Sequence, residues 1–269
     1  MIDIPTYIEE WRAKAPWNYD YQIQQDLIIS RALIDLYSDS FIKDNLAFRG
    51  GTALNKLFLK TPARYSEDID LVQIHNQPIG STIDSIRKAL YWLGKPNHDY
   101  TKRSVRLVYK YPAIGEVPKK LKIEINITER FTVNGFKQYH FSMEDNWFSS
   151  NALITSYDIN ELIGTKLRAL HQRSKGRDLF DLYWVIKNEL INCKDVVNIF
   201  INYCENKNDK VTRALFEETF QSKLENKEFL DDILSLLPRK NASWAPDQAV
   251  QIIKERIVEL LPGNPLKKI

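Results

Sequence analysis

The sequence predicts an α+β protein, with a mixed sheet and flanking helices in residues 1–150 and an all-helical half in residues 151–269. Two observations predict this division. Short apolar runs typical of strands are found before residue 150, and after about residue 157 apolar residues recur at helical spacing. Of the 269 residues, 43% are hydrophobic, which is enough apolar surface to build a folded core.

The first half alternates helices with short strands. Helices are predicted where apolar residues recur every three or four positions: residues 23–36, 52–60 and 79–93. Pro62 and Gly94 mark the ends of the second and third of these helices. Strands are predicted where short apolar runs lie between turn residues: residues 46–49, 69–72, 104–110 and 120–127.

A β-hairpin is predicted around Asn134-Gly135, because both residues of such a turn need positive φ. Its strands would be residues 131–133 and 136–141. After the hairpin the pattern becomes helical, and Asp158 provides an acidic cap for the first helix of the second half. Helices are predicted there over the following segments: residues 158–170, residues 179–186, and residue 246 to about residue 260.

Charge and composition exclude several classes of protein. The 38 basic and 35 acidic residues leave a net charge of +3, which is too mild to indicate a nucleic-acid partner by itself. Cys193 and Cys204 are too few for a disulfide framework and lack the spacing of a zinc site. The first residues do not have the order of a signal peptide, and no apolar run approaches the ~20 residues of a membrane helix. We therefore expect a cytoplasmic protein without a membrane partner.

Asp68 and Asp70 are the first candidates for chemistry. Residues two apart on a strand project from the same face, so both carboxylates would point to one place. Such a pair repels itself unless a cation lies between its members, and oxygen ligands favour Mg²⁺ or Mn²⁺ over zinc. An Asp-x-Asp pair is often only a solvated pair of surface acids, but Ile69 and Leu71 make the other face of this strand apolar.

Gly50-Gly51 lies between a predicted strand and a predicted helix, and Thr52 follows with a hydroxyl group. Glycines at such a bend let backbone N–H groups approach a phosphate closely, although glycine is also common in ordinary strand-to-helix turns. Glu124 is the candidate third acid, on the polar face of a neighbouring strand. It would hold a metal or act as a general base, and the alternative is an exposed glutamate paired with Lys122.

A basic segment follows in the helical half, and its cations are Lys166, Arg168, Arg173, Lys175 and Arg177. This segment would grip a triphosphate or an RNA backbone, or form a solvated helix face. Asp178 and Asp181 share one helix face and would fix a cation, bind a base or ribose, or cap the helix. We expect His171 to be a surface or core histidine rather than a catalyst.

Taken together, these segments resemble the AbiEii/MenT nucleotidyltransferases of the DNA polymerase β-like superfamily. The resemblance covers residues 46–187 and rests on four motifs in a fixed order: Gly50-Gly51-Thr52-Ala53-Leu54, Arg64-x-Ser66-x-Asp68-x-Asp70-Leu71, Glu161-Leu162-x-x-x-Lys166-x-x-Ala169-Leu170 and Arg177-Asp178-x-x-Asp181-Leu182-Tyr183. Sixteen residues separate Gly51 from Asp68, which is longer than is usual in the broad superfamily.

The resemblance implies a toxin of a bacterial toxin–antitoxin or phage-defence (abortive infection) system, with a winged-helix antitoxin repressor as partner. It implies a polymerase β-like fold and transfer of NMP from an NTP to RNA, in particular to the 3′ end of tRNA. The resemblance assigns Asp68 and Asp70 to the binding of Mg²⁺ or Mn²⁺. It assigns the following residues to nucleotide binding: Gly50, Gly51, Thr52, Arg64, Ser66 and Asp181. Lys166 and Asp178 would complete the nucleotide site and take part in catalysis. Glu124 as third metal ligand follows from the strand pattern instead.

Two other functions remain open from the sequence. One is a non-enzymatic module that binds nucleotide or RNA, against which the intact Asp68/Asp70 pair argues. The other is a nucleotidyltransferase of the aminoglycoside-modifying type, for which an acidic acceptor pocket is expected, whereas the segment after Gly164 is basic.

Overall fold

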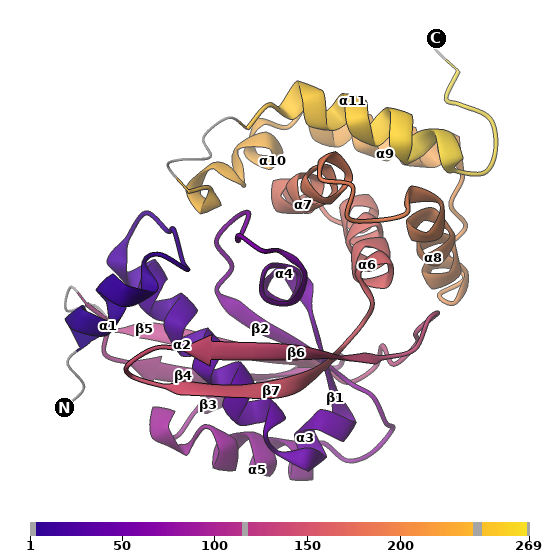
Figure 1. Ribbon diagram of the computed structural model, residues 1–269. Coiled ribbons are helices and arrows are strands. Elements are labelled where there is room, and N and C mark those ends of the chain that lie inside the picture. Colours follow the sequence, from indigo (N-terminus) through magenta and orange to yellow (C-terminus); the bar gives the residue numbers. More distant parts are fainter. Residues whose placement is uncertain (1–3, 115–117, 239–243, 268–269) are drawn as a thin grey trace. The chain divides into compact units, whose positions relative to one another are not determined.

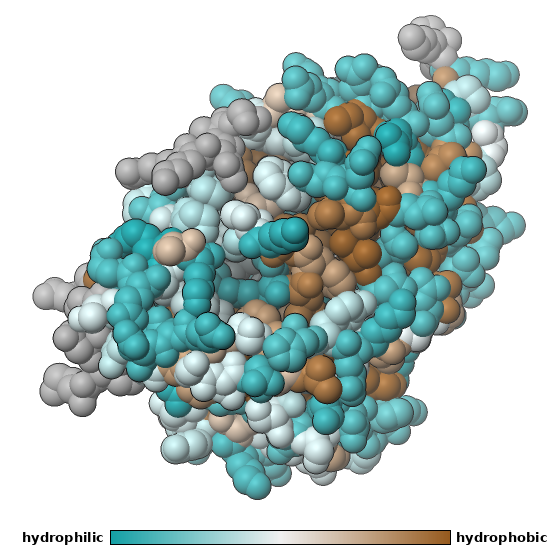
Figure 2. All heavy atoms as spheres, in the orientation of Figure 1, coloured by the Kyte–Doolittle hydropathy of each residue, from teal (hydrophilic) through white to brown (hydrophobic). Residues whose placement is uncertain are grey.

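The computed structural model describes residues 4–114, 118–238 and 244–267. The chain forms two compact units, Met1–Tyr157 and Asp158–Ile269 (Figure 1). The first unit contains the sheet and the second is helical, so the α+β fold class predicted from the sequence is confirmed. In the view of Figure 2 hydrophilic side chains cover most of the surface, as expected for a protein whose apolar residues form cores.

A seven-stranded mixed sheet forms the centre of the first unit, in the order β3-β4-β5-β2-β1-β7-β6. Its strands are β1 (Leu46–Arg49), β2 (Asp68–Gln73), β3 (Asn97–Tyr100), β4 (Ser104–Tyr111), β5 (Lys119–Asn126), β6 (Lys137–Glu144) and β7 (Ser149–Ser156). The pairs β2–β5 and β1–β7 are parallel, and the other neighbours are antiparallel. This order brings β2 and β5, which are far apart in the sequence, into direct contact.

Helices pack on both sides of this sheet. They are α1 (Ile4–Trp11), α2 (Asp20–Tyr37), α3 (Ser40–Asn45), α4 (Gly50–Ala53) with a following π-helical turn (Leu54–Phe58), α5 (Gly80–Ala89) and a 3₁₀ turn (Tyr91–Leu93). In Figure 1, α3 and α5 lie on one side of the sheet and α4 lies on the other. The long helix α2 is buried along most of its length, and its Asp26 accepts hydrogen bonds from Trp11, Trp17 and Lys56.

The strands β2 and β5 have one apolar and one polar face. Ile69 and Leu71 of β2 and Ile123 and Ile125 of β5 are almost completely buried. Because successive side chains on a strand point to opposite faces, the residues between them share the polar face. Burial of the apolar face fixes the register, since a slip of one residue would turn every apolar side chain to the wrong face.

The second unit contains α6 (Ile159–Gln172), α7 (Gly176–Lys187), α8 (Cys193–Glu205), α9 (Arg213–Leu224), α10 (Lys227–Asp231), α11 (Pro246–Arg256) and two 3₁₀ turns (Leu234–Leu236 and Val258–Leu260). The predicted cap is correct, because the Asp158 side chain accepts the N–H of Glu161 at 2.9 Å. α6 packs against α8 at Gly164, where an added Cβ would lie 2.6 Å from Ile199 Cγ2. Across the described residues, every helix is too short or too polar to span a membrane.

The predicted hairpin at Asn134-Gly135 is wrong. Gly135 does adopt positive φ (73°), but β6 begins only at Lys137 and pairs with β7 instead of with residues 131–133. The reason is that a preference for a turn does not choose the partner of the following strand. The prediction also missed β7, which extends the sheet beyond residue 150, and β3, whose residues are exposed and show no apolar alternation.

Candidate active site

A row of charged side chains crosses four adjacent strands on the polar face of the sheet. In the strand register Arg49 of β1 lies opposite Asp70 of β2, Asp70 lies opposite Glu124 of β5, and Glu124 lies opposite Arg106 of β4. Asp68 shares this face because it is two residues from Asp70 on the same strand. Three predicted acids, which we call the carboxylate group (Asp68, Asp70 and Glu124), therefore lie on one face of the sheet.

Two cations hold the outer members of the carboxylate group. Lys122 Nζ lies 2.8 Å from Asp68 Oδ2 and 3.7 Å from Glu124 Oε2. Arg106 Nε donates to Glu124 Oε2 at 3.1 Å, and Ser104 Oγ donates to Glu124 Oε1 at 3.2 Å. The alternative expectation from the sequence is that Glu124 pairs with Lys122. Glu124 does lie within ion-pair distance of Lys122, but Arg106 is the nearer of the two cations.

Asp70 has the least favourable surroundings for a negative charge. Burial raises the pKa of its carboxyl group above the ordinary value, and the charges of Asp68 and Glu124 raise it further, while Arg49 and Lys122 act in the opposite direction. Two like charges on neighbouring strands disfavour each other in this way. A cation that binds beside Asp70 would relieve the repulsion.

The bend at Gly50 lies directly against Asp70. Gly50 has a φ of 83°, and an added Cβ would overlap Asp70 Oδ2. A side chain at position 50 is therefore excluded twice, by the backbone conformation and by the carboxylate. Gly51 is equally close to the guanidinium group of Arg64, and its added Cβ would lie 3.1 Å from Ser66 Oγ.

Thr52 joins the bend to β2. Its buried hydroxyl group donates to the backbone oxygen of Asp68 at 2.6 Å and lies 2.8 Å from Ser66 Oγ. Because a hydroxyl has one proton, Ser66 is the donor in the second contact. Arg64 is also buried and donates to the backbone oxygen of Tyr65 at 3.0 Å. The structure thus brings the bend and the carboxylate group together, and it uses the Thr52 proton to position Asp68.

The carboxylate group has the donor chemistry of a Mg²⁺ or Mn²⁺ site, since all its ligands are oxygens. Crowding of negative charge around Asp70 likewise fits a cation. Within the described part of the chain, however, no three His, Cys, Asp or Glu side chains converge closely enough to hold a metal ion together. Lys122 and Arg106 instead form ion pairs with the Asp68 and Glu124 side chains.

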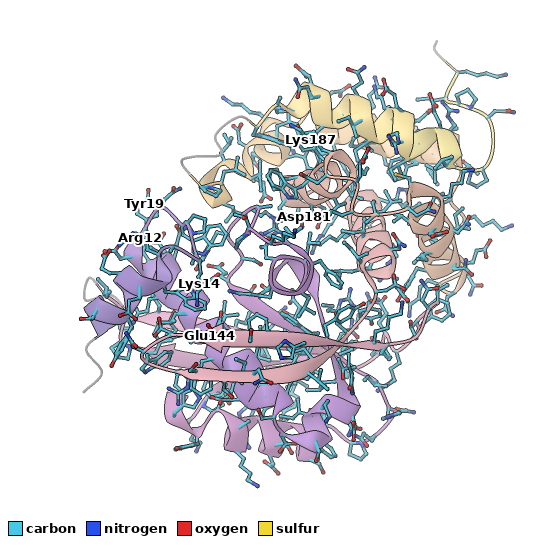
Figure 3. All side chains as sticks on the ribbon, in the orientation of Figure 1. Arg12, Lys14, Tyr19, Glu144, Asp181 and Lys187 are labelled. Carbon is cyan, nitrogen blue, oxygen red and sulfur yellow. The ribbon has the colours of Figure 1, made fainter. Side chains whose placement is uncertain are left out.

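In the second unit the predicted residues form ion pairs with one another. Lys166 Nζ of α6 lies 2.6 Å from Oδ2 of Asp181, which Figure 3 labels on α7, and both side chains are buried. Arg173 makes two hydrogen bonds to the buried Asp178, at 2.8 and 3.0 Å. The structure thus places each of the three predicted site residues of this unit, Lys166, Asp178 and Asp181, next to a group of opposite charge.

The basic segment is an open basic surface only in part, because the side chains of Arg173 and Lys175 are 53% and 49% exposed whereas Lys166 and Arg168 are buried. Lys166 and Arg168 are 6% and 7% exposed, and the Arg168 guanidinium lies over the ring of Tyr203 at 5.1 Å. Lys175 Nζ lies 3.8 Å from Asp232 Oδ1. Neighbouring acidic and aromatic groups compensate these charges, so a count of basic residues overestimates the charge offered to a ligand.

His171 is a packed histidine, as expected. Its ring stacks on Phe216 with 5.5 Å between centroids and meets Phe200 edge-on at 5.9 Å. Burial, together with the nearby charge of Lys223, lowers the pKa of His171 below its usual value. The environment therefore favours a neutral ring.

The sequence interpretation missed Arg49 and Arg106 as neighbours of the acids, and it treated Lys122 only as an alternative partner of Glu124. The alternation in β4 and β5 does place Arg106, Lys122 and Glu124 on polar faces. Finding them together requires the register of β4 against β5, which the separate segments do not reveal.

The family model for the "Nucleotidyl transferase AbiEii toxin, Type IV TA system" matches residues 31–252. The chain belongs to this family. It is therefore a nucleotidyltransferase of a toxin–antitoxin system, and the resemblance inferred from the four sequence motifs is confirmed. Membership also implies a nucleotide substrate and an antitoxin partner. No curated protein matches the sequence.

Solved structures share the fold of this AbiEii-family protein. JHP933 from Helicobacter pylori is 18% identical, with a TM-score of 0.53 over 89% of this chain and 90% of that chain. MenT4, a nucleotidyltransferase toxin from Mycobacterium tuberculosis, is 16% identical, with a TM-score of 0.52 over 97% of this chain and 98% of that chain. At these identities the similarity establishes the fold, and the roles of single residues rest on the site itself.

Proposed function

We propose that this AbiEii-family toxin transfers a nucleoside monophosphate from an NTP to the 3′-hydroxyl of an RNA, most readily the 3′ end of tRNA, and so inhibits translation. The observation that carries the proposal is the contact between the Gly50 bend and Asp70, with Asp68 on the same strand face. A glycine bend, whose backbone N–H groups can bind phosphate, beside two carboxylates fits a metal-dependent nucleotidyl transfer.

The carboxylate group would hold Mg²⁺ or Mn²⁺. A divalent cation bound there neutralises the charge of phosphate oxygens and of the attacking oxygen during transfer. The backbone N–H groups of Gly50, Gly51 and Thr52 would receive the triphosphate, with Arg64 and Ser66 supporting this bend.

Residues of the chain orient the reacting groups. The RNA oxygen forms a bond to the α-phosphorus, the bond from the α-phosphorus to the bridging oxygen breaks, and pyrophosphate leaves. The proton of the hydroxyl group passes to a carboxylate, for which Glu124 is our candidate. Ser104 and Arg106 fix its position. Orientation and charge compensation are the main contributions of a protein to such a reaction.

We further propose that Lys166, Asp178 and Asp181 of the second unit take part in nucleotide binding. Their support is the match of their motifs to the family and the buried ion pair of Lys166 with Asp181 at 2.6 Å. We also propose that the chain works in the cytoplasm with a winged-helix antitoxin repressor, and that its arrest of translation protects against phage.

The test is a transfer assay with each radiolabelled NTP, total tRNA and, separately, aminoglycoside acceptors. Asp70→Asn keeps the shape of the side chain and removes its charge, and we expect transfer to fall by about 100-fold or more. Asp84→Asn on the exposed surface of α5 is the matched control and should retain activity.

Each other outcome contradicts the proposal in a different way. Full transfer by the Asp70→Asn variant would refute the role of the carboxylates. Label in the aminoglycosides alone would identify a small-molecule nucleotidyltransferase. Binding of NTP or RNA without any transfer would favour a non-enzymatic module.

A further inference from the structure

Lys122 is placed to act on the whole carboxylate group. Its Nζ lies within ion-pair distance of both Asp68 and Glu124, and its charge also lowers the pKa of Asp70. The two arginines beside the carboxylate group form other ion pairs. Arg106 pairs with Glu124, and Arg49 Nη1 lies 3.4 Å from Glu129 Oε2. Of these three cations, Lys122 is the one that lies within ion-pair distance of two members of the carboxylate group.

A divalent cation and Lys122 need the same atoms. The oxygens nearest to Nζ are Asp68 Oδ2 and Glu124 Oε2, and both belong to the proposed metal ligands. An ammonium group is a compact point charge on a flexible stem, so it resembles a metal ion in its demand for carboxylate oxygens. A metal ion that takes these oxygens competes with Nζ, because the two positive charges repel each other at a few ångströms.

Lys122 has room to move. Its side chain is 35% exposed, and the side chains of Asp68 and Glu124 are 32% and 27% exposed, so all three are in partial contact with solvent. A triphosphate that enters next to Asp68 and Asp70 brings several negative charges and offers Nζ another partner. It would release the two carboxylates at the moment when the metal ion arrives with it.

We propose that Lys122 is a built-in competitor for the metal, which keeps the carboxylate group from binding free divalent cations and makes metal binding depend on the nucleotide. This inference rests on the proposed function, because it assumes that the carboxylate group binds the metal. Lys122 is then a positioning residue. Its ammonium group leaves the carboxylate oxygens of Asp68 and Glu124 and binds phosphate oxygens of the NTP.

The test measures binding of Mn²⁺ to the full chain by the loss of the electron paramagnetic resonance signal of free Mn²⁺. Binding is measured without nucleotide and with a non-hydrolysable NTP analogue, and a titration of the analogue without protein gives the Mn²⁺ that the analogue binds by itself, which is subtracted. We expect the wild type to bind Mn²⁺ weakly alone and about tenfold more tightly with the analogue. Lys122→Met should bind Mn²⁺ alone about tenfold more tightly than the wild type, since the competing charge is gone.

Two variants serve as controls. Lys122→Arg keeps the positive charge and should behave like the wild type in the absence of nucleotide. Lys120→Met removes a charge from an exposed residue on the same face of the same strand, two residues away, and should also leave Mn²⁺ binding unchanged. Thermal unfolding in metal-free buffer checks the fold, and Lys122→Gln is the second variant if the methionine variant is unstable.

The outcomes separate this inference from the proposed function. Equal Mn²⁺ affinities of the wild type and Lys122→Met without nucleotide would overturn the inference, and so would wild-type affinity that does not respond to the analogue. If Asp70→Asn binds Mn²⁺ and transfers NMP like the wild type, the proposed metal site itself fails. If that variant loses both properties while Lys122→Met equals the wild type, only the role of Lys122 is refuted.

Discussion

Replacing Gly50 with alanine tests the link between the glycine bend and the acid pair. The added methyl group meets two obstacles. The backbone φ of 83° is one that L-residues rarely adopt, and the methyl carbon would overlap Asp70 Oδ2 while lying 3.1 Å from both Cβ and Cγ of Asp70. The substitution therefore strains the bend and pushes the Asp70 carboxylate away from its position.

The two costs can be separated with a second glycine. Gly135 has a similar φ of 73° but nothing within 4 Å of its added Cβ, so Gly135→Ala measures the backbone cost alone. That cost is about 1–2 kcal/mol in the free energy of unfolding. Overlap of an added methyl group with a packed neighbour contributes about 1–3 kcal/mol more, so Gly50→Ala should lose about 2–5 kcal/mol in total.

The assays are urea unfolding and nucleotidyl transfer. We expect Gly135→Ala to keep the transfer rate of the wild type, whereas Gly50→Ala should lose about 100-fold, because a shift of ~1 Å in a positioning group has effects of this size. Gly80→Ala is the neutral control, since its φ is not positive and its added Cβ meets no neighbour within 4 Å.

The result that would refute this reasoning is specific. If Gly50→Ala and Gly135→Ala lose the same free energy of unfolding, Asp70 does not press on the bend. If, in addition, Gly50→Ala transfers NMP at the wild-type rate, the position of Asp70 against the bend is irrelevant to the reaction.

Two further predictions concern the second unit. Asp181→Ala removes the carboxylate that lies 2.6 Å from the buried Lys166 ammonium group, so the free energy of unfolding should fall by about 3–5 kcal/mol. A second substitution in the same chain, Lys166→Met, should restore part of this loss. If the double variant recovers no stability, the buried ion pair does not have the energetic role that we assign to it. His171, packed on Phe216, has a lowered pKa, so the unfolded chain takes up a proton near pH 6.5 before the folded one does, and stability should decrease as the pH falls through that value. His171→Leu should flatten the decrease between pH 7 and 5 in urea titrations, and an unchanged slope would argue against it.

The strands around the site were predictable because burial imposes a simple pattern on them. Ile69 and Leu71 alternate with Asp68 and Asp70, and the structure starts β2 at Asp68, one residue before the predicted strand. By contrast β7 was missed, since its first three residues are exposed and its apolar ones do not alternate cleanly. A pattern of hydrophobicity predicts a strand only where one face is consistently buried.

The candidate site was predictable as a list of acids but not as an arrangement of charges. The spacing of Asp68 and Asp70 is enough to place both on one face. The neighbours of Asp70 depend on long-range pairing: Arg49 comes from an antiparallel partner and Glu124 from a parallel one. Separate segments do not say which strands pair, so the cations that hold the acids appear only in the folded chain.

The connection between the glycine bend and the acid pair is long, and side-chain hydrogen bonds hold its two ends together. Sixteen residues separate Gly51 from Asp68, yet the two ends are fixed by the Thr52 hydroxyl on the Asp68 carbonyl. Asn55 secures the intervening chain, because its side chain donates to the Arg64 carbonyl at 2.8 Å and accepts the N–H of Ala63 at 3.2 Å. Loop closure costs little more for a long loop than for a short one, so these few hydrogen bonds offset the added length. These hydrogen bonds therefore fix the start of β2 beside the bend, as the proposed nucleotidyl transfer would require.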